Sequence, residues 1–532
     1  MTTRREILAS FLGLPLALAG CSSRPQVTDF DGEIVGPSMD VGHRLRDGLR
    51  LKVPEDRWQK KKVVIVGGGV AGLSAAWRLK RMGFDDFVLL ELESVIGGTS
   101  RSGRSPVVAY PWGAHYLPLP MRENDRLIQL LQEMSILEGV DEEGHPVARE
   151  QYLCRDPQER IFYVGRWHEG LYLHAGASQE DRRQMSSFEK EVNQWVDWRD
   201  GKGRRAFAIP RASGSDDAEV TALDRVSMQE WLDARNLTSS RLRWYVDYAC
   251  RDDYGMSMSE TSAWAGLFYF ASRRRKSGQA SQPILTWPEG NGRLVSHMAS
   301  SAKKQLHLGL AVTEINPRGP REIEVTALDV KSQRPIGYRA EKVIYAGPQF
   351  VGSRLIRNRR VEGFEHSPWL VANVHLKSRP KSEGFPMAWD NVLYESRSLG
   401  YVVATHQALI DHGPTVLTWY YPMCDDRPVS SRKRMQSLDW RECADIALTD
   451  LEQAHPEVRR LTTRVDVMRW GHAMIRPRVG FVWSQDRRDA RRPMGDIHFA
   501  NTDLSSLPLF EEAFYHGNRA ADEILSPQRR AD

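Results

Sequence analysis

One stretch, residues 63–105, constrains the fold of this chain more than any other part of the sequence. It opens with an apolar run that is typical of a buried parallel strand. Three glycines in a G-x-G-x-x-G arrangement then open a helical pattern: Gly67, Gly69 and Gly72. A second apolar strand follows this helix and ends at Glu91, about twenty residues after the last of these glycines. The stretch therefore predicts a strand–helix–strand unit.

Each part of this unit has a physical task in holding a dinucleotide. Gly67 permits a tight turn, Gly69 lets the backbone approach a pyrophosphate, and Gly72 lets the helix and the strand pack closely. The N-terminus of the helix offers unpaired N–H groups and the positive end of its dipole to the phosphates. The Glu91 carboxylate can accept hydrogen bonds from ribose hydroxyls. We therefore expect these four residues to bind a dinucleotide cofactor.

The residues after Glu91 narrow the choice of dinucleotide. Residues 97–101, Gly-Gly-Thr-Ser-Arg, resemble the second glycine pair of the flavin-containing amine oxidase and phytoene desaturase superfamily. Residues 110–116, Tyr-Pro-Trp-Gly-Ala-His-Tyr, resemble the loop of that superfamily that brings a Gly-Ala turn close to the flavin ring. The resemblance implies FAD rather than NAD, with five further cofactor-binding residues. These are Gly97, Gly98, Thr99, Gly113 and Ala114.

The resemblance continues toward the C-terminal end of the chain. A strand pattern near residue 312 resembles the strand that contacts the adenine in this superfamily, with Val312 at the contact. Residues 495–521 resemble the last strand and helix of the FAD domain. There the resemblance makes Asp503 the candidate for the ribityl contact and Ala513 a further cofactor contact. No cysteine follows Cys443, so we expect the FAD to be bound non-covalently.

This resemblance implies an α/β fold. We expect a Rossmann-like FAD-binding domain of the two-dinucleotide-binding, G-x-G-x-x-G type, with an inserted α+β substrate domain. The substrate domain is expected to contain several strands and one long helix, from about residue 431 to residue 453. The expected parts are a signal peptide at 1–21, a tether at 22–61, an FAD-binding domain at 62–116, 285–366 and 465–532, and a substrate domain at 117–284 and 367–464.

The N-terminus has the pattern of a targeting segment. Arg4 and Arg5 precede a short apolar stretch, and Leu-Ala-Gly-Cys at residues 18–21 resembles a bacterial lipobox, in which Cys21 becomes lipidated. A twin-arginine signal directs export, and several acyl chains anchor a protein stably to a membrane. We therefore expect a periplasmic lipoprotein. Ser22 after the cysteine favours the outer membrane.

Composition excludes several other classes of protein. The formal net charge of +5 is too small to imply a nucleic-acid partner. The densest basic run, Arg273–Lys276, is interpreted as a solvated loop, with contact to anionic lipid as the alternative. The five cysteines contain no C-x-x-C pair, so neither a metal site nor a disulfide scaffold follows from them.

The chemistry of this superfamily resides mainly in the flavin, while the protein supplies position, a dry pocket and electrostatics. Many amine oxidases place a lysine near the flavin, but the corresponding position here is Asn373. The adjacent acids Asp252 and Asp253 could attract a cationic amine, or they could be a solvated pair at the end of a helix. The candidates for contact with the reacting groups are His115, Trp470, His472 and Lys377.

Three functions compete at this point. The first is an FAD-dependent, amine oxidase-like oxidoreductase that oxidises a small-molecule amine to an imine by hydride transfer to flavin N5, with oxygen as acceptor. The second is an FAD-dependent desaturase or dehydrogenase of an apolar isoprenoid or lipid. The third is a flavoprotein without turnover. Fold alone does not choose among them.

Overall fold

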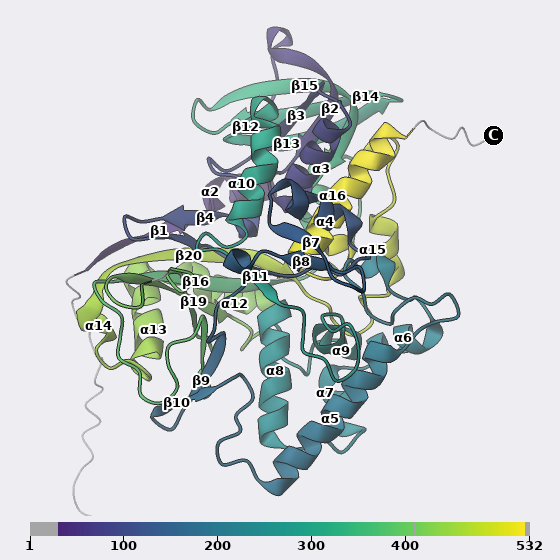
Figure 1. Cartoon of the computed structure of the whole chain (residues 1–532). Coiled ribbons are helices and arrows are strands. Elements are labelled where there is room, and N and C mark those ends of the chain that lie inside the picture. Colours follow the sequence, from purple (N-terminus) through teal and green to yellow (C-terminus); the bar gives the residue numbers. More distant parts are fainter. Residues whose placement is uncertain (1–29, 409, 527–532) are drawn as a thin grey trace, which may run out of the picture.

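The computed structural model describes residues 30–408 and 410–526. The predictions for Arg4, Arg5 and Cys21 lie outside these residues. Among the described residues, no helix is both long and apolar enough to cross a membrane. Two large sheets dominate the structure, one in the upper half and one across the middle of Figure 1, and the chain passes between them several times.

The first sheet contains the strand–helix–strand unit. Its strand order is β12-β3-β2-β15-β14-β13, and β21 pairs in parallel with β15. Strands β12, β3, β2 and β15 run parallel to one another, whereas β13 and β14 form an antiparallel extension. The strands are β2 (Trp58–Val66), β3 (Phe87–Glu91), β12 (Leu306–Leu308), β13 (Leu310–Gly319), β14 (Glu322–Asp329), β15 (Arg334–Tyr345) and β21 (Ile497–Phe499).

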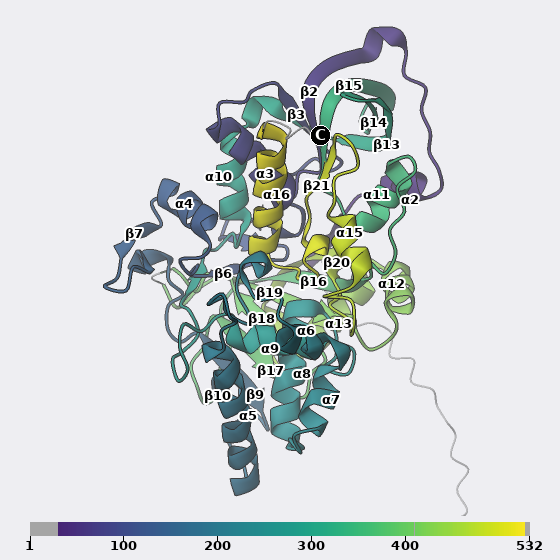
Figure 2. The same cartoon turned by 90° about the vertical axis from the view of Figure 1, so that its right-hand side faces the viewer.

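Close packing of helices on this sheet depends on small residues. Helix α3 (Val70–Arg81) follows the glycine turn, and α10 (Gly292–Ser301) and α16 (Phe510–Leu525) lie beside it (Figure 2). A Cβ atom at Gly517 of α16 would lie 2.1 Å from the carbonyl oxygen of Ala71, so only glycine permits this approach. The predicted first and last elements of the FAD-binding fold therefore pack directly on each other.

The second sheet has the order β1-β20-β16-β19-β18-β17-β9-β10. Its central strand β16 is buried along its whole length. Alternate residues of β16 pack on opposite sides: one set against helix α13, the other toward the cavity described below. The strands are β1 (Asp31–Gly36), β9 (Glu159–Tyr163), β10 (Arg166–Glu169), β16 (His366–Leu376), β17 (Asp390–Leu393), β18 (Tyr401–Val403), β19 (Thr415–Pro422) and β20 (Thr462–Ile475).

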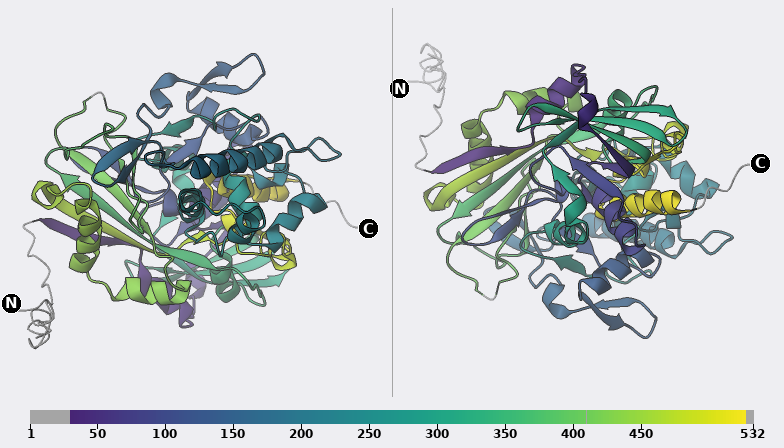
Figure 3. Two further views of the ribbon diagram at one scale, coloured as in Figure 1. Left: turned by 90° about the horizontal axis from the view of Figure 1, so that it is seen from below. Right: turned by 90° about the horizontal axis from the view of Figure 1, so that it is seen from above.

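A group of helices closes the lower side of the molecule in Figure 1, and Figure 3 shows it from below and from above. Capping boxes begin α5 and α7, the latter at Ser227 as its Ser-x-x-Glu pattern predicts. The helices are α5 (Gln179–Asp197), α6 (Ala218–Ala222), α7 (Met228–Asp233), α8 (Ser240–Tyr254) and α9 (Ala263–Ala271).

The remaining elements are shorter or lie at the edges of the two sheets. The helices are α2 (Met39–Arg46), α4 (Asp125–Glu133), α11 (Gln349–Leu355), α12 (Pro428–Ser437), α13 (Trp440–Glu452), α14 (Val458–Leu461) and α15 (Gln485–Ala490). The strands are β4 (Ser102–Arg104), β5 (Ala109–Pro111), β6 (Tyr116–Pro118), β7 (Leu137–Val140), β8 (Pro146–Ala148) and β11 (Ile284–Thr286). Single 3₁₀ turns lie at Glu55–Arg57, Gly98–Ser100, Glu150–Tyr152, Arg211–Ser213, Leu223–Arg225, Lys303–Gln305 and Thr502–Leu504.

Three boundaries differ from those expected. The segment 22–61 is not only a tether, because β1 pairs with β20 and α2 packs on the first sheet. The third part of the FAD-binding domain does not begin at residue 465, because β20 belongs to the second sheet. The single helix expected over 431–453 is two helices, since Asp439 caps the start of α13 and ends any continuation of α12.

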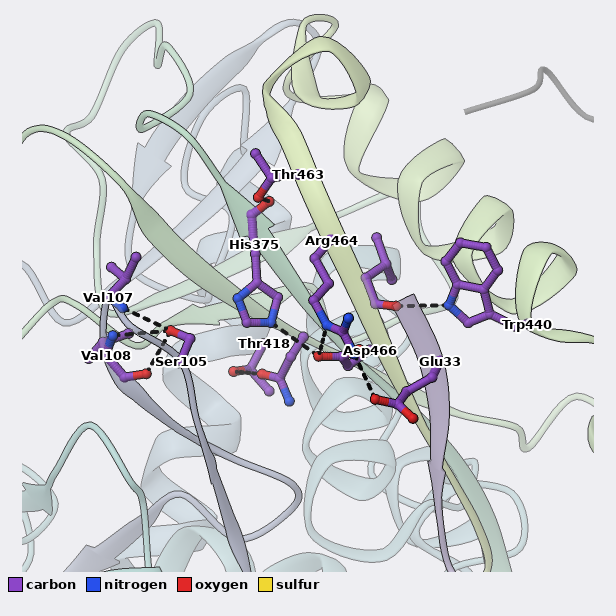
Figure 4. Close-up of polar contacts among 12 residues, drawn as sticks. Glu33, Ser105, Val107, Val108, His375, Thr418, Trp440, Thr463, Arg464 and Asp466 are labelled. Carbon is purple, nitrogen blue, oxygen red and sulfur yellow. Dashed lines mark hydrogen bonds and ion pairs between the residues drawn. The ribbon is translucent and has the colours of Figure 1, made fainter. Parts of the chain in front are cut away.

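The N-terminal segment connects the two sheets, and we call residues 31–46 the strap. Figure 4 shows one end of it, where Arg464 of β20 is 2.7 Å from Glu33 and 2.8 Å from Asp466. At the other end, Ser38 donates hydrogen bonds from its backbone N and its hydroxyl to the Glu93 carboxylate, 2.9 and 3.0 Å away. Because Glu93 follows the nucleotide-binding strand β3, the strap links the second sheet to the cofactor side of the first.

A bulky residue at Gly32 should weaken this connection. A Cβ atom there would lie 1.9 Å from the Val465 carbonyl oxygen and 2.6 Å from the Trp440 ring. We predict that Gly32→Val destabilises the protein by about 1–3 kcal/mol through overpacking, measured as a lower Tm. Glu33→Ala, which removes only an exposed ion pair, should cost about 1 kcal/mol or less. Equal Tm values for Gly32→Val and the wild type would show that β1 does not hold the sheet.

Candidate functional site

The two glycine-rich segments predicted to bind the cofactor lie against each other. The backbone N–H of Gly97 donates a 2.8 Å hydrogen bond to the Gly68 carbonyl, and Gly69 and Gly97 pair as a parallel bridge. Gly67 adopts a φ of +108°, which explains the need for glycine at this turn. A Cβ atom at Gly72 would lie 1.8 Å from the Gly67 carbonyl oxygen, as expected for close helix–strand packing.

Open space over one of these glycines tests whether the turn fits a pyrophosphate. A Cβ atom at Gly68 would lie 2.9 Å from the Glu91 carboxylate, but one at Gly69 would meet no atom within 4 Å. Gly69 also stands at the N-terminus of α3, where backbone N–H groups are available. The turn is thus tight where the protein packs on itself and open where the phosphates are expected, so these residues fit FAD.

Glu91 lies at the end of β3, as predicted for the ribose contact. One carboxylate oxygen accepts a 2.5 Å hydrogen bond from the Gly68 N–H and the other a 2.8 Å bond from the Glu93 N–H. Burial raises the pKa of this carboxyl group, while the two backbone donors oppose that rise. Each carboxylate oxygen can accept a further bond, so the predicted contact with ribose hydroxyls remains open to Glu91.

The Gly-Ala loop leads from the glycine turns to a cavity of about 150 Å³, which we call the inner cavity. The Ala114 N–H donates to the Thr99 carbonyl, and a Cβ atom at Gly113 would lie 2.3 Å from the same oxygen. Thr99, Gly113 and Ala114 all line the cavity, together with Asn291. Asn291 is 1% exposed and its Oδ1 is buried without a partner, so the cavity offers an unsatisfied acceptor.

Aromatic and aliphatic side chains form much of the cavity wall. Trp470 donates a 2.7 Å hydrogen bond to the Trp112 carbonyl, and Tyr420 donates a 2.9 Å bond to the Gly113 carbonyl. These bonds fix both rings beside the Gly-Ala loop. His115 stacks on Tyr420 with ring centroids 4.9 Å apart. Burial lowers the pKa of His115 to about 4, so its imidazole is neutral at pH 7.

Carboxylates also line the inner cavity. Glu511, in the first turn of α16, is 5% exposed, and burial raises its pKa to about 7. Asp252, in the last turn of α8, has a pKa raised by burial and then by the charge of Asp253. Arg273 neutralises Asp253, with its Nη2 3.0 and 2.9 Å from the two carboxylate oxygens. Within the described residues, neither Asp252 nor Glu511 has an Arg or Lys nitrogen within 4.0 Å.

A second, larger space adjoins the first, and we call it the outer chamber. It measures about 450 Å³. Seven residues line both spaces: His115, Tyr116, Pro118, Tyr248, Asp252, Arg273 and Asp390. Glu159 lines only the outer chamber, on β9, where it is in register with Asp390 of β17. Acidic groups therefore extend outward from the inner cavity.

The three arginines of the basic run Arg273–Lys276 are not solvated, although Lys276 at its end is 59% exposed. Each of the four side chains of the run has an acidic partner. The three arginine side chains are at most 19% exposed. Sequence spacing could not show this, because the partners come from distant parts of the chain. The partners are Asp253, Glu189, Asp141 and Glu143.

The four catalytic candidates are divided by the structure. His115 and Trp470 line the inner cavity. His472 does not line it; its ring lies 4.4 Å from that of Phe350. Lys377 is exposed at the end of β16 and does not line the cavity. Asn373, the residue that the resemblance aligns with the family lysine, is fully buried, donates to the Pro111 carbonyl and accepts from Thr418.

Two further predicted cofactor contacts stay predictions. Asp503 is 1% exposed, and its two oxygens accept hydrogen bonds from the Gln349 N–H at 2.7 Å and the His366 Nε2 at 2.9 Å, which leaves each oxygen able to accept one more. Ala513 packs into the core between α16 and α3. Val312 is buried beside β2 and β3, where the adenine contact remains a prediction.

The sequence did not single out three carboxylates of the site. Glu511 lies beside Glu512 at the start of a helix, where acids are common for reasons of helix polarity. Glu159 and Asp390 are the first residues of two paired strands and lie 231 residues apart in the sequence. Their neighbours Arg160 and Asn391 are hydrogen-bonded across the same pair of strands. Only the parallel pairing of β9 with β17 brings these two acids together.

Comparison with known proteins gives one matching family and several similar solved structures. The sequence model of one family, described as flavin containing amine oxidoreductase, matches residues 70–525. A putrescine oxidase double mutant is similar in structure, with a TM-score of 0.66 and 16% identity, over 88% of this chain and 100% of that chain. A cyclohexylamine oxidase from Brevibacterium oxydans is similar with a TM-score of 0.59 and 15% identity, over 88% of this chain and 99% of that chain.

Two further similarities come from other enzymes. A CLA-producing fatty acid isomerase from P. acnes has a TM-score of 0.60 and 14% identity, over 88% of this chain and 99% of that chain. A Baeyer-Villiger monooxygenase, peniC, from Penicillium patulum is 50% identical over 48 residues, which span only 9% of this chain and 8% of that protein. Because the three solved structures are only 14–16% identical to this chain, they show the fold alone. That fold is a Rossmann-like FAD-binding domain with an inserted substrate domain.

The open space over Gly69 separates cofactor binding from folding. We predict that Gly69→Val lowers the FAD content of purified protein at least about tenfold, since the side chain would occupy the phosphate position. The Tm of the cofactor-free protein should change little, because the new side chain meets no protein atom. Flavin absorbance after denaturation and the apoprotein Tm are the measurements.

Gly72→Val is the matched control. It would place a Cβ atom 1.8 Å from a backbone oxygen and should lower the Tm of the apoprotein as well. Wild-type FAD content in Gly69→Val would contradict the assignment of this turn to the pyrophosphate.

Proposed function

Because the chain belongs to the flavin containing amine oxidoreductase family, we propose that this FAD-dependent oxidoreductase oxidises an amine to an imine. Bound FAD supplies the hydride acceptor for this reaction. The residues of the chain have the remaining tasks, which are to bind the amine, to orient it, to exclude water and to take up its proton.

The observation that carries this proposal is a group of uncompensated carboxylates in the inner cavity, Asp252 and Glu511 among them. Asp252 and Glu511 line it without a basic partner within 4.0 Å among the described residues. A buried carboxylate that lacks a partner favours a bound cation. Amines reach the enzyme mostly as ammonium ions, and the rings of Trp470 and Tyr420 provide faces that also attract such cations.

Asp252 is positioned to take the proton that the ammonium ion must lose. Only the neutral amine has the lone pair that forms the C=N bond as the hydride leaves the neighbouring carbon. The N–H bond of the ammonium breaks, and the proton moves to the Asp252 carboxylate, whose raised pKa favours the protonated form. The neutral His115 ring lines the inner cavity together with Asp252 and cannot repel the cation.

The alternative, desaturation or dehydrogenation of an apolar isoprenoid or lipid, has one observation in its favour. The inner cavity is walled in part by Trp369, Val371 and Leu399. An apolar substrate, however, would leave Asp252 and Glu511 buried against hydrocarbon, which is unfavourable for a polar group without a partner. The carboxylates therefore favour the amine.

Export and anchoring remain our proposal from the N-terminal sequence. We propose that Arg4 and Arg5 direct export to the periplasm and that Cys21 carries the lipid. Replacement Cys21→Ser should abolish incorporation of labelled fatty acid and move the protein from the membrane to the soluble fraction. Unchanged membrane association of this variant would contradict the lipid anchor.

The proposed reaction predicts which compounds reduce the flavin. Anaerobic mixing of holoenzyme with a panel of primary amines should bleach the flavin absorbance. Bleaching only by alkenes or lipids would transfer the assignment to the desaturase, and bleaching by no compound would leave a flavoprotein without turnover.

Replacement Asp252→Asn should slow this reduction at pH 7 by about tenfold or more, because a charge-assisted contact and a proton acceptor are lost. The matched control is Asp486→Asn, a change of the same kind at an exposed position outside the cavities. Equal rates for Asp252→Asn and the wild type would remove Asp252 from the mechanism.

A further inference from the structure

The outer chamber contains more carboxyl groups than the arginines around it can pair with. Three carboxylates line it, from three different elements: Glu159, Asp252 and Asp390. Arg273 and Arg274 line it too, but each is already paired with an acid, Arg273 with Asp253 at 2.9 Å and Arg274 with Glu189 at 2.6 Å. The three carboxylates are therefore uncompensated among the described residues.

Burial makes this arrangement costly without a ligand. It raises the pKa of Glu159 to about 7 and raises that of Asp390, where the charge of Glu159 adds to the effect. A cation placed among these groups would favour their ionised forms again.

The remaining wall of the chamber also suits a cation. Tyr248 is 2% exposed and lines both spaces, and a hydrogen bond with its hydroxyl opposes the rise in the pKa of Asp390. The rings of Tyr245, Tyr269 and Trp389 lie around the same space. Aromatic faces beside carboxylates are the groups that recognise an ammonium ion.

The position of the chamber indicates how such a cation would arrive. Asp252 and Asp390 line both spaces, whereas Glu159 lines only the outer one. An amine oxidised in the inner cavity would therefore have its other end in the outer chamber. We propose that the outer chamber binds a second cationic centre of the same substrate through Glu159, so that the enzyme selects diamines and polyamines over monoamines. This inference rests on the proposed amine oxidation for its reaction, but not for its binding test.

The test compares the binding of two unreactive cations to the oxidised holoenzyme. Hexamethonium has a quaternary ammonium group at each end of a six-carbon chain. Hexyltrimethylammonium has the same chain with such a group at one end only. Both lack the N–H group needed for an imine to form, so binding is followed by the change in flavin absorbance without turnover. We expect hexamethonium, or a bis-quaternary homologue with a longer linker, to bind about tenfold or more tightly, as for one charge-assisted contact.

Variants locate the contact. Glu159→Gln keeps the size of the side chain and should bring the ratio of the two dissociation constants close to one. The control Glu169→Gln changes an exposed acid on the neighbouring strand β10, outside both spaces, and should keep the wild-type ratio. Flavin content and Tm show that both variants are folded, and Asp390→Asn provides a second test of the same chamber.

The outcomes separate this inference from the proposed reaction. Equal binding of mono- and bis-quaternary ions to the wild type, across all linkers, would overturn the second-cation site even if monoamines bleach the flavin. A large ratio that Glu159→Gln leaves unchanged would overturn the role of Glu159. Selective binding in an enzyme that no amine reduces would keep the binding site and refute amine oxidation.

Discussion

The contact between two glycine-rich backbones is the constraint on which the rest of the structure depends. Gly97 donates to the Gly68 carbonyl, and a Cβ atom at Gly98 would lie 3.4 Å from the Gly69 Cα. This contact fixes the entry of α3 and carries the chain on to Thr99, whose carbonyl accepts from Ala114. A short series of backbone hydrogen bonds thus connects the expected phosphate position with the wall of the inner cavity, so cofactor and substrate sites share one frame.

The substrate side depends on side chains, whereas the cofactor side depends on their absence. The glycine turns fit because side chains are absent, whereas the two spaces beyond them are defined by charged side chains brought in by α8, β9, β17 and α16. Arginines are present, but Asp253 and Glu189 neutralise the two that line the outer chamber. What remains is a set of partly buried carboxylates near neutral His115. Their desolvation is offset most readily by a cationic ligand.

Sequence alone located the cofactor frame well and the substrate wall poorly. The glycine turn and β3, with Glu91 at its end, are local, so their spacing shows their geometry directly. Trp470 and His115 lie in segments that resemble the family, and both line the cavity. The contact of Asp503 with His366, which is 137 residues away, could not be predicted from local spacing. Glu159 and Asp390 of the outer chamber meet only through the pairing of β9 with β17, which no local pattern encodes.

The central claim is that uncompensated carboxylates make this flavin-side site selective for a cation. The most direct test compares a benzyltrimethylammonium ion with its uncharged carbon analogue, neopentylbenzene, in binding to the oxidised holoenzyme at pH 8. The two have nearly the same shape, and neither can form an imine. The account predicts that the cation binds at least about tenfold more tightly, as for one buried charge-assisted contact. Equal affinity, or tighter binding of the uncharged compound, would contradict it.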